Sequence, residues 1–212
     1  MKSFIVIFYV LLISSNVLSK NIQPDWNEGN VMLESEGYFT GWIFLDTKND
    51  FLLLKKGDQI KAYPALKVKK LQVFDDDLKV YRDYITYDLP LTKGLSKKIF
   101  LEVVLLGEIS IYRKEKAIPS SNLKAEGTSE YRTKHDYVYY AEVDNDLLPL
   151  SNFRKCVFPL LVQLTQEEVL QFKKENKLKS HNLAHQIILI DYCNSLQNPF
   201  YKGLKNTIVS KN

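Results

Sequence analysis

The sequence predicts an α+β fold, in which an antiparallel β meander, curled into a barrel or half-barrel, precedes a C-terminal cluster of about three helices. Two observations lead to this prediction. Between residues 38 and 150, short runs rich in aromatic and β-branched residues alternate with polar turns, as in strands joined by hairpins. After residue 150 the hydrophobic period becomes helical and helix-capping residues appear.

Residues 1–19 are interpreted as a secretory signal peptide. Lys2 precedes an apolar run from Phe4 to Ile13, and small polar residues follow as far as Ser19, after which we expect cleavage. This run is shorter than the roughly 20 apolar residues of a membrane helix. No later stretch could cross a membrane, so the mature chain is expected to have no transmembrane segment. We therefore expect export to the periplasm, the cell surface or the medium. An uncleaved anchor is the alternative interpretation.

The strands are expected where turn residues separate the apolar runs. Residues 20–37 are interpreted as an irregular N-terminal lead-in. YFTGWIFLD and FLLLKK predict a first hairpin around TKND, and KVKKLQVF and LKVYRDYITY predict a second around the aspartates at 75–77. Gly107 is expected to mark a bend or bulge, and YVYYAEV leads through the polar residues 144–146 into a short apolar run. Residues 116–136 are polar and aperiodic, which predicts a long loop within the β domain.

Helices are expected in residues 151–198, packed on the sheet, before a tail at residues 199–212. The first helix should end at Pro159, because proline disrupts a helix interior. The second is expected to open with the capping box TQEE at residues 165–168. Ser180 is the expected cap of the third helix.

Several of these segments together resemble a known group of proteins. The exported start is followed by a Tyr- and Leu-rich meander containing GEISIYR, by the hairpin YYAEVDND and by a closing helix that ends in IDYCNS. This succession resembles uncharacterised secreted proteins of Bacteroidota-type bacteria over most of the mature chain. Cys193, between Tyr192 and Asn194, is a departure from their pattern. The resemblance implies an exported β-rich domain and carries over no activity or catalytic residue.

The composition constrains the class of partner. The chain has 212 residues, 45% of them hydrophobic, which is ample for a packed core, and a formal net charge of +4. Because nucleic-acid-binding domains usually present a concentrated basic face, so mild a balance argues against a nucleic-acid partner.

His181 and His185, in the stretch HNLAH, are the strongest chemical signal. Zinc hydrolases of the HExxH type place two histidines at this spacing on one helical face, with a glutamate as general base. Here Asn182 takes the place of that glutamate, and an amide cannot act as a base. In an unbroken helix, which turns about 100° per residue, Asp191 would point away from both histidines. A structural role at the start of a helix is favoured, and a metal-dependent hydrolase that uses the pair is the alternative.

The two cysteines, Cys156 and Cys193, allow two interpretations. Export to an oxidising compartment permits a disulfide between them. Free cysteines are also common in protein interiors, so a pair of unbonded thiols is the other interpretation. A cysteine nucleophile is disfavoured, because no base is placed to activate either thiol within its own segment.

Tyrosines supply the candidate ligand-binding residues, Tyr81, Tyr84 and Tyr139, among the 13 tyrosines of the chain. Aromatic rows on an exposed sheet face can bind a glycan or a protein partner. The alternative is that they pack in the core and in cross-strand pairs. With no complete catalytic motif and no predicted cofactor, the sequence favours an exported, non-enzymatic binding or envelope-associated protein. Its partner is expected to be a protein or glycan of the cell envelope.

Overall fold

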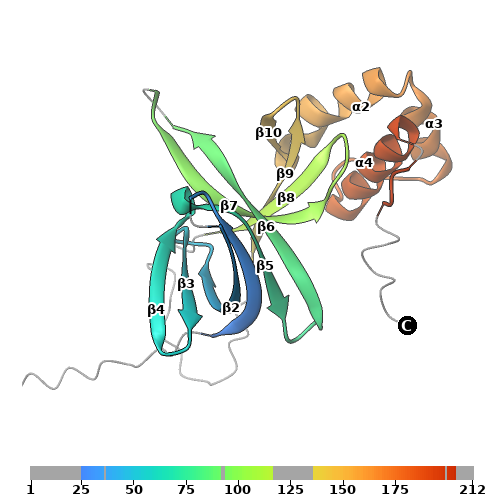
Figure 1. Cartoon of the computed structure of the whole chain (residues 1–212). Coiled ribbons are helices and arrows are strands. Elements are labelled where there is room, and N and C mark those ends of the chain that lie inside the picture. The colour runs from blue at the N-terminus through green and yellow to red at the C-terminus, as the bar shows by residue number, and fades with distance from the viewer. Residues whose placement is uncertain (1–24, 36, 92–93, 117–135, 199, 204–212) are drawn as a thin grey trace, which may run out of the picture.

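The computed structural model describes residues 25–35, 37–91, 94–116, 136–198 and 200–203. It consists of one 10-stranded antiparallel sheet followed by a C-terminal cluster of helices (Figure 1). The predicted α+β fold is therefore confirmed. The sheet is curled and remains open, because no ladder joins its two outermost strands in the described part of the chain.

The strands form a meander with one change of order. They are β1 (Asn27–Leu33), β2 (Gly37–Asp46), β3 (Phe51–Lys56), β4 (Gln59–Pro64), β5 (Val68–Asp75), β6 (Val80–Pro90), β7 (Ser96–Leu105), β8 (Ser110–Glu115), β9 (Tyr137–Val143) and β10 (Asp146–Pro149). Across the sheet their order is β10-β9-β8-β7-β6-β5-β1-β2-β3-β4. The 3-10 turn η1 (Ala65–Lys67) carries the chain from β4 to β5, which pairs with β1 instead of β4.

The predicted hairpins β2–β3, β5–β6 and β9–β10 are confirmed. Gly107 lies in the bend between β7 and β8. The two ends of the long segment expected to be a loop are joined, because Lys116 N–H donates to the Asp136 carbonyl at 2.8 Å. The rest of that segment, the predicted signal peptide and most of the predicted tail lie outside the described residues.

The interpretation of residues 20–37 as irregular is wrong for β1, which lies in the middle of the sheet. It pairs with β2 on one side and β5 on the other, and Val31 and Leu33 point into the core. Gly29 permits the close pairing, because a Cβ there would collide with the Gln72 carbonyl. Only two large apolar side chains point inward in NEGNVML, so its strand pattern is weak. Strand β4 was likewise not predicted.

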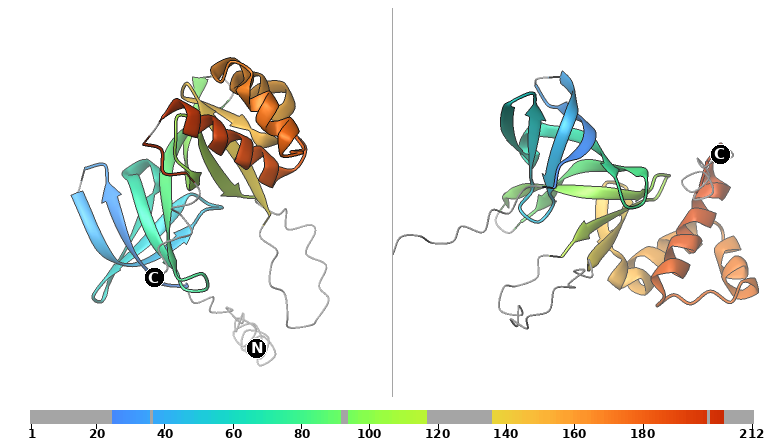
Figure 2. Two further views of the ribbon diagram at one scale, coloured as in Figure 1. Left: turned by 90° about the vertical axis from the view of Figure 1, so that its right-hand side faces the viewer. Right: turned by 90° about the horizontal axis from the view of Figure 1, so that it is seen from below.

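Apolar clusters lie at the two ends of the molecule. The first is enclosed by the curl of β1–β5 and includes Val31, Ile43, Leu52, Leu71 and Phe100. The second joins β7–β9 to the helices and includes Ile111, Ala141, Phe153, Leu161 and Ile190. Figure 2 shows the helices beside one end of the sheet and β1–β4 at the other. The expectation that the helical segment packs on the sheet is thus met by this second cluster.

The helices are α2 (Phe158–Leu164), α3 (Glu168–Glu175) and α4 (Leu183–Gln197), and the short turns η4 (Leu150–Asn152) and η5 (Phe153–Val157) precede them. Pro159 begins a helix instead of ending one, because it occupies the first turn of α2, where no intrahelical N–H bond is lost. Among the described residues no helix is long and apolar enough to cross a membrane.

Two predicted caps are corrected by the structure. The expected capping box does not form, since Glu167 precedes α3 in a left-handed conformation and caps nothing with its side chain. Thr165 Oγ1 instead donates to the Leu161 carbonyl at 2.8 Å and accepts from Val169 N–H at 3.3 Å. Helix α4 is capped by Asn182 and not by Ser180.

A buried carboxylate, Asp50, fixes the curl of the sheet. It lies in the β2–β3 turn, is 4% exposed, and has a φ of 58°. Its Oδ1 accepts from Phe100 N–H of β7 at 3.1 Å and from Lys114 Nζ of β8 at 2.5 Å. Its Oδ2 is 2.7 Å from Lys97 Nζ, and its carbonyl accepts from Ala65 N–H at 2.9 Å. One residue thus joins the first hairpin to β7, β8 and η1.

Asn194 of α4 links the helical cluster to the sheet by hydrogen bonds. Its side chain, in a residue 1% exposed, accepts from Ile109 N–H at 2.8 Å and donates to the Ile109 carbonyl at 2.9 Å. Gly107 permits this approach, because a Cβ there would lie 2.5 Å from Asn194 Cγ. The amide therefore completes the backbone hydrogen bonding of the β7–β8 bend.

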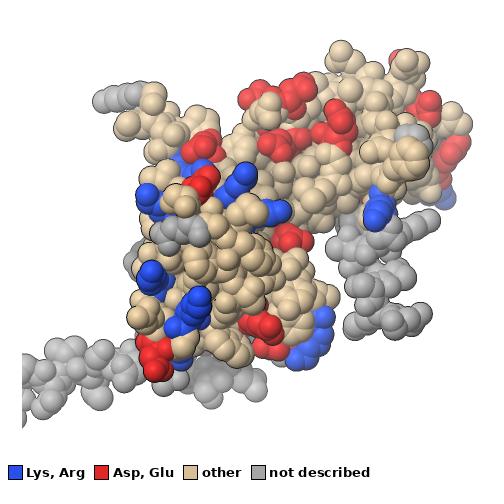
Figure 3. Space-filling model, in the orientation of Figure 1, with Lys and Arg blue, Asp and Glu red and all other residues tan. Residues whose placement is uncertain are grey.

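Charge is distributed unevenly over the surface. In the view of Figure 3, Lys and Arg side chains gather over the β3–β4 side of the sheet, while Asp and Glu gather over the β9–β10 hairpin. The small net charge of the chain thus conceals local excesses of each sign, and the local environment decides what a surface can bind.

We expect Asp50→Asn to lower the free energy of unfolding by about 3 kcal/mol, because it removes the buried counter-charge of Lys114. Asn tolerates a positive φ, so backbone strain should not contribute. Asp58→Asn, in the exposed β3–β4 turn, removes the same charge and should change stability by less than about 0.5 kcal/mol. Urea unfolding followed by circular dichroism measures both. Equal losses for the two variants would contradict the role of Asp50.

We expect Gly107→Ala to destabilise the protein by roughly 2 kcal/mol, because the new Cβ collides with the Asn194 side chain. Asn194→Ala should lose about 2 kcal/mol, because it leaves two buried backbone groups of Ile109 unpaired. The Gly107→Ala change should then cost less in the Asn194→Ala background, where the collision is removed. Strict additivity in the thermal unfolding of the double variant would contradict the proposed contact.

Candidate functional site

A row of side chains crosses one face of the sheet from β6 to β9. Tyr84, Glu102, Arg113 and Tyr139 are consecutive cross-strand partners in this row. Tyr84 packs against the apolar cluster enclosed by β1–β5, and Tyr139 packs against the cluster beneath the helices. The polar centre of the row therefore lies between two apolar clusters on the same face.

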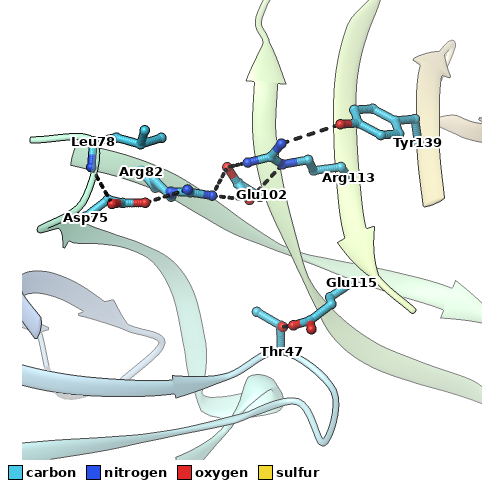
Figure 4. Close-up of polar contacts among 8 residues, drawn as sticks. All are labelled: Thr47, Asp75, Leu78, Arg82, Glu102, Arg113, Glu115 and Tyr139. Atoms are coloured by element: carbon cyan, nitrogen blue, oxygen red, sulfur yellow. Dashed lines mark hydrogen bonds and ion pairs between the residues drawn. The ribbon is translucent and has the colours of Figure 1, made fainter. Parts of the chain in front are cut away.

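Glu102 is the centre of a network of ion pairs (Figure 4). It is 8% exposed and accepts from Arg113 Nε at 2.9 Å and Nη2 at 2.5 Å, a bidentate arrangement. Arg82 Nη1 donates to the same carboxylate at 3.1 and 3.3 Å. Arg82 also pairs with Asp75, whose Oδ1 accepts from Leu78 N–H at 2.9 Å. Each charge is thus held by at least one opposite charge.

Arg113 is held on three sides. Besides its bonds to Glu102, its Nη1 donates to Tyr139 Oη at 3.4 Å, and its Cζ lies 4.3 Å from the centroid of the Tyr137 ring. A guanidinium stacked on an aromatic ring is favourable by about 0.5–2 kcal/mol. These contacts fix the side chain before any ligand arrives, so little conformational entropy is lost when it binds one.

A cleft of about 590 Å³ opens over this network. It is bounded by the end of β2, the β2–β3 turn and parts of β5–β9. Besides Tyr84, Glu102 and Arg113, its lining residues include Phe44, Thr47, Phe74, Asp75, Glu115 and Tyr137. Thr47 Oγ1 lies 3.4 Å from Glu115 Oε2, which joins the two sides of the cleft (Figure 4).

The environment of the cleft keeps its groups in defined protonation states. Burial and the nearby charge of Glu102 raise the pKa of Tyr84, so its phenol stays protonated. Burial acts to lower the pKa of Arg113, but the hydrogen bonds to Glu102 and Tyr139 and the charge of Glu102 together outweigh it, and the pKa is raised. Burial acts to raise the pKa of Asp75, but a backbone hydrogen bond and the charge of Arg82 lower it overall. Arg113 and Asp75 therefore stay charged at neutral pH.

The cleft combines fixed hydrogen-bonding groups with aromatic rings. Carboxylates offer acceptors and guanidinium groups offer donors, while the rings offer flat apolar surface. Comparisons of the chain with family models, with curated proteins and with solved structures find no match.

The predicted tyrosines all lie at or next to this site, with different roles. Tyr84 lines the cleft, and Tyr139 accepts a hydrogen bond from the lining residue Arg113. Tyr81 is 46% exposed, and its ring packs edge-on against that of Phe74 at 5.0 Å. Tyr137 lines the cleft and was not predicted. Strand alternation could have found it, because residues two apart share a face with each other.

Glu102 and Arg113, the charged pair of the row, were not predicted from the sequence either. Glu102 is the one charged residue of the run IFLEVVL, whose other side chains are apolar. A charged residue in such a strand is the available signal, since unpaired charges are rarely buried. Its partner Arg113 belongs to another strand, and only the register of β7 and β8 brings the two together.

HNLAH forms the start of α4 and does not place its two histidines on one helix. His181 lies in the turn before α4, and Asn182 caps the helix by accepting from His185 N–H at 3.1 Å. His185 Nδ1 accepts from Lys179 N–H at 2.9 Å, while His181 Nδ1 lies 3.4 Å from Arg154 Nη2. Among the described residues, no group of three His, Cys, Asp or Glu side chains gathers to hold a metal ion.

The disulfide interpretation is corrected, because the structure leaves Cys156 and Cys193 as free thiols. Cys156 is exposed on η5, whereas Cys193 of α4 is 0% exposed and packs in the cluster beneath the helices. One thiol faces solvent and the other the core, so they do not meet. Burial raises the pKa of Cys193 to about 11, which keeps it protonated and unreactive at neutral pH.

We expect one thiol of the native protein to react rapidly with a disulfide reagent at pH 8 and the second only after unfolding. The fast reaction should be lost in Cys156→Ser and kept in Cys193→Ser, because only Cys156 is exposed. Absorbance of the released thiolate measures both phases. An absence of reactive thiols in denaturant without reductant would show a disulfide and contradict the structure.

Proposed function

We propose that this protein is an exported binding protein that takes a neutral or amino-bearing glycan in the cleft over Glu102. Export is supported by the predicted signal peptide. The observation that carries the proposal is that Tyr84, Glu102 and Arg113 of the cross-strand row line the cleft together with Tyr137, while Tyr139 holds Arg113 from beside it. A concave site lined by rings and by a few fixed polar groups is typical of small-ligand binding.

The charge of the lining favours this class of glycan over an acidic one. The lining carries six carboxylates, from three consecutive aspartates at 75–77, Asp25, Glu102 and Glu115, against three cations. The cations Arg82, Arg113 and Lys114 are already paired with carboxylates. Carboxylates can only accept hydrogen bonds, so they suit the hydroxyl and amino groups of a sugar.

The aromatic residues suit the apolar face of a sugar ring. Phe44, Phe74 and Tyr137 come from three separate strands and all line the cleft. Aromatic side chains present a large, rigid contact surface at a low cost in conformational entropy. A rigid ring beside fixed carboxylates would contact one face of a sugar and its hydroxyl groups together. This arrangement supports a binding role and assigns no reaction to the site.

We expect residues 20–212 to bind members of a printed array of neutral and amino-bearing oligosaccharides. Tyr137→Ala should weaken the strongest interaction about tenfold, or roughly 1.4 kcal/mol, in isothermal titration, because it removes a ring from the cleft. The matched control is Tyr38→Ala, which removes a tyrosine 61% exposed on β2 outside the cleft and should leave the affinity unchanged. Binding to no array member, or equal losses in both variants, would overturn the proposal.

A further inference from the structure

A second hollow, of about 440 Å³, lies in the helical cluster. It is lined by Arg154, Phe158, Lys173, Leu178, Lys179, Ser180 and His181. These residues come from η5, α2, α3 and the turn before α4. None of them lines the cleft over Glu102, so the two sites are separate.

The lining of this hollow is basic. Arg154, Lys173 and Lys179 contribute three positive charges, and no Asp or Glu belongs to the lining. In the described part of the chain, no carboxylate forms an ion pair with any of the three. By contrast, the cations of the cleft are each paired. Gathered charges of one sign without a counter-charge attract an ion of the opposite sign.

Two contacts hold two of these cations, Arg154 and Lys173, in place. Arg154 Nη2 lies 3.4 Å from His181 Nδ1. Because a guanidinium only donates hydrogen bonds, His181 Nδ1 must accept in this contact. Lys173 Nζ lies 4.6 Å from the centroid of the Phe158 ring, a distance at which the ring attracts the ammonium.

The same contacts oppose a metal site at His181. Its Nδ1 faces Arg154, and the three neighbouring cations would repel a metal ion. The hollow therefore suits an anion, whereas the histidine pattern suggested a metal cation. The second histidine of the pattern, His185, contacts Lys179 N–H and does not line the hollow.

We propose that this hollow binds a phosphate-type oxyanion. Arg154 presents a planar fork that matches the oxygens of a phosphoryl group, and Lys173 and Lys179 add point charges. Phe158 and Leu178 form an apolar part of the lining, which suits an anion carried on an apolar group. The ion can be free phosphate or the phosphoryl group of a monoester, and the two sources differ in their use of the apolar part.

The test is isothermal titration of residues 20–212 with inorganic phosphate and with phenyl phosphate, at constant ionic strength in chloride. Arg154→Gln and Lys173→Gln should each weaken binding at least about tenfold. The matched control is Lys174→Gln, which removes the same charge from an exposed neighbour of Lys173 on α3. It should change the affinity less than about twofold.

The outcomes separate the alternatives. Tighter binding of phenyl phosphate supports a monoester as the ligand, and equal binding supports the free ion. No binding of either probe at about 10 mM overturns the proposal, as does a loss in Lys174→Gln equal to that in Lys173→Gln, because binding would then reflect general surface charge. Phosphate affinity should be unaffected by Tyr137→Ala, so failure of the glycan proposal is distinguishable from failure of this one.

Discussion

The curl of the sheet depends on Asp50. The carboxylate of this residue is buried and contacts strands that are distant from it in the sequence. Its oxygens contact Phe100 N–H, Lys114 and Lys97, so the β2–β3 turn is drawn onto β7 and β8. A buried charge is tolerated only when it is paired and hydrogen-bonded. Asp50 therefore favours the one arrangement of the turn in which these partners are in reach. The cleft is a direct consequence, because Thr47 of the same turn faces Glu115 of β8 across it. Without that closure β2 would not form a wall of the cleft.

The opposite end of the molecule is organised by a neutral interaction. Asn194 supplies one donor and one acceptor to Ile109, as a neighbouring strand would, and Gly107 leaves room for it. The helical cluster is thereby fixed to the β7–β8 bend in one orientation. Strands β7 and β8 also carry Glu102 and Arg113. The same two strands therefore connect the bend that Asn194 contacts with the bottom of the cleft.

The two candidate sites differ in how their charges are balanced. In the cleft, Glu102 holds two arginines and one of these also holds Asp75, so the polar groups are fixed and largely neutralised. Because carboxylates outnumber cations in the whole lining, the cleft suits a neutral or amino-bearing, hydroxyl-rich ligand. In the helical hollow, Arg154, Lys173 and Lys179 have no carboxylate beside them within the lining. Both sites combine cations with aromatic rings. The cleft has an excess of carboxylates and is expected to bind a neutral or amino-bearing ligand, whereas the hollow has only cations and is expected to bind an anion.

Most of the secondary structure follows from the sequence alone, because hydrophobic period and turn residues act locally. Local patterns predicted the hairpins β2–β3, β5–β6 and β9–β10 and the helical end of the chain. They also indicated Tyr84 and Tyr139 as candidate ligand-binding residues, although not as parts of one row. The folded chain alone shows the place of β1, the pairing of Glu102 with Arg113, and the proximity of Arg154 to Lys173 and His181. Each of these depends on strand register or on helix packing between distant segments, and no local pattern specifies either one.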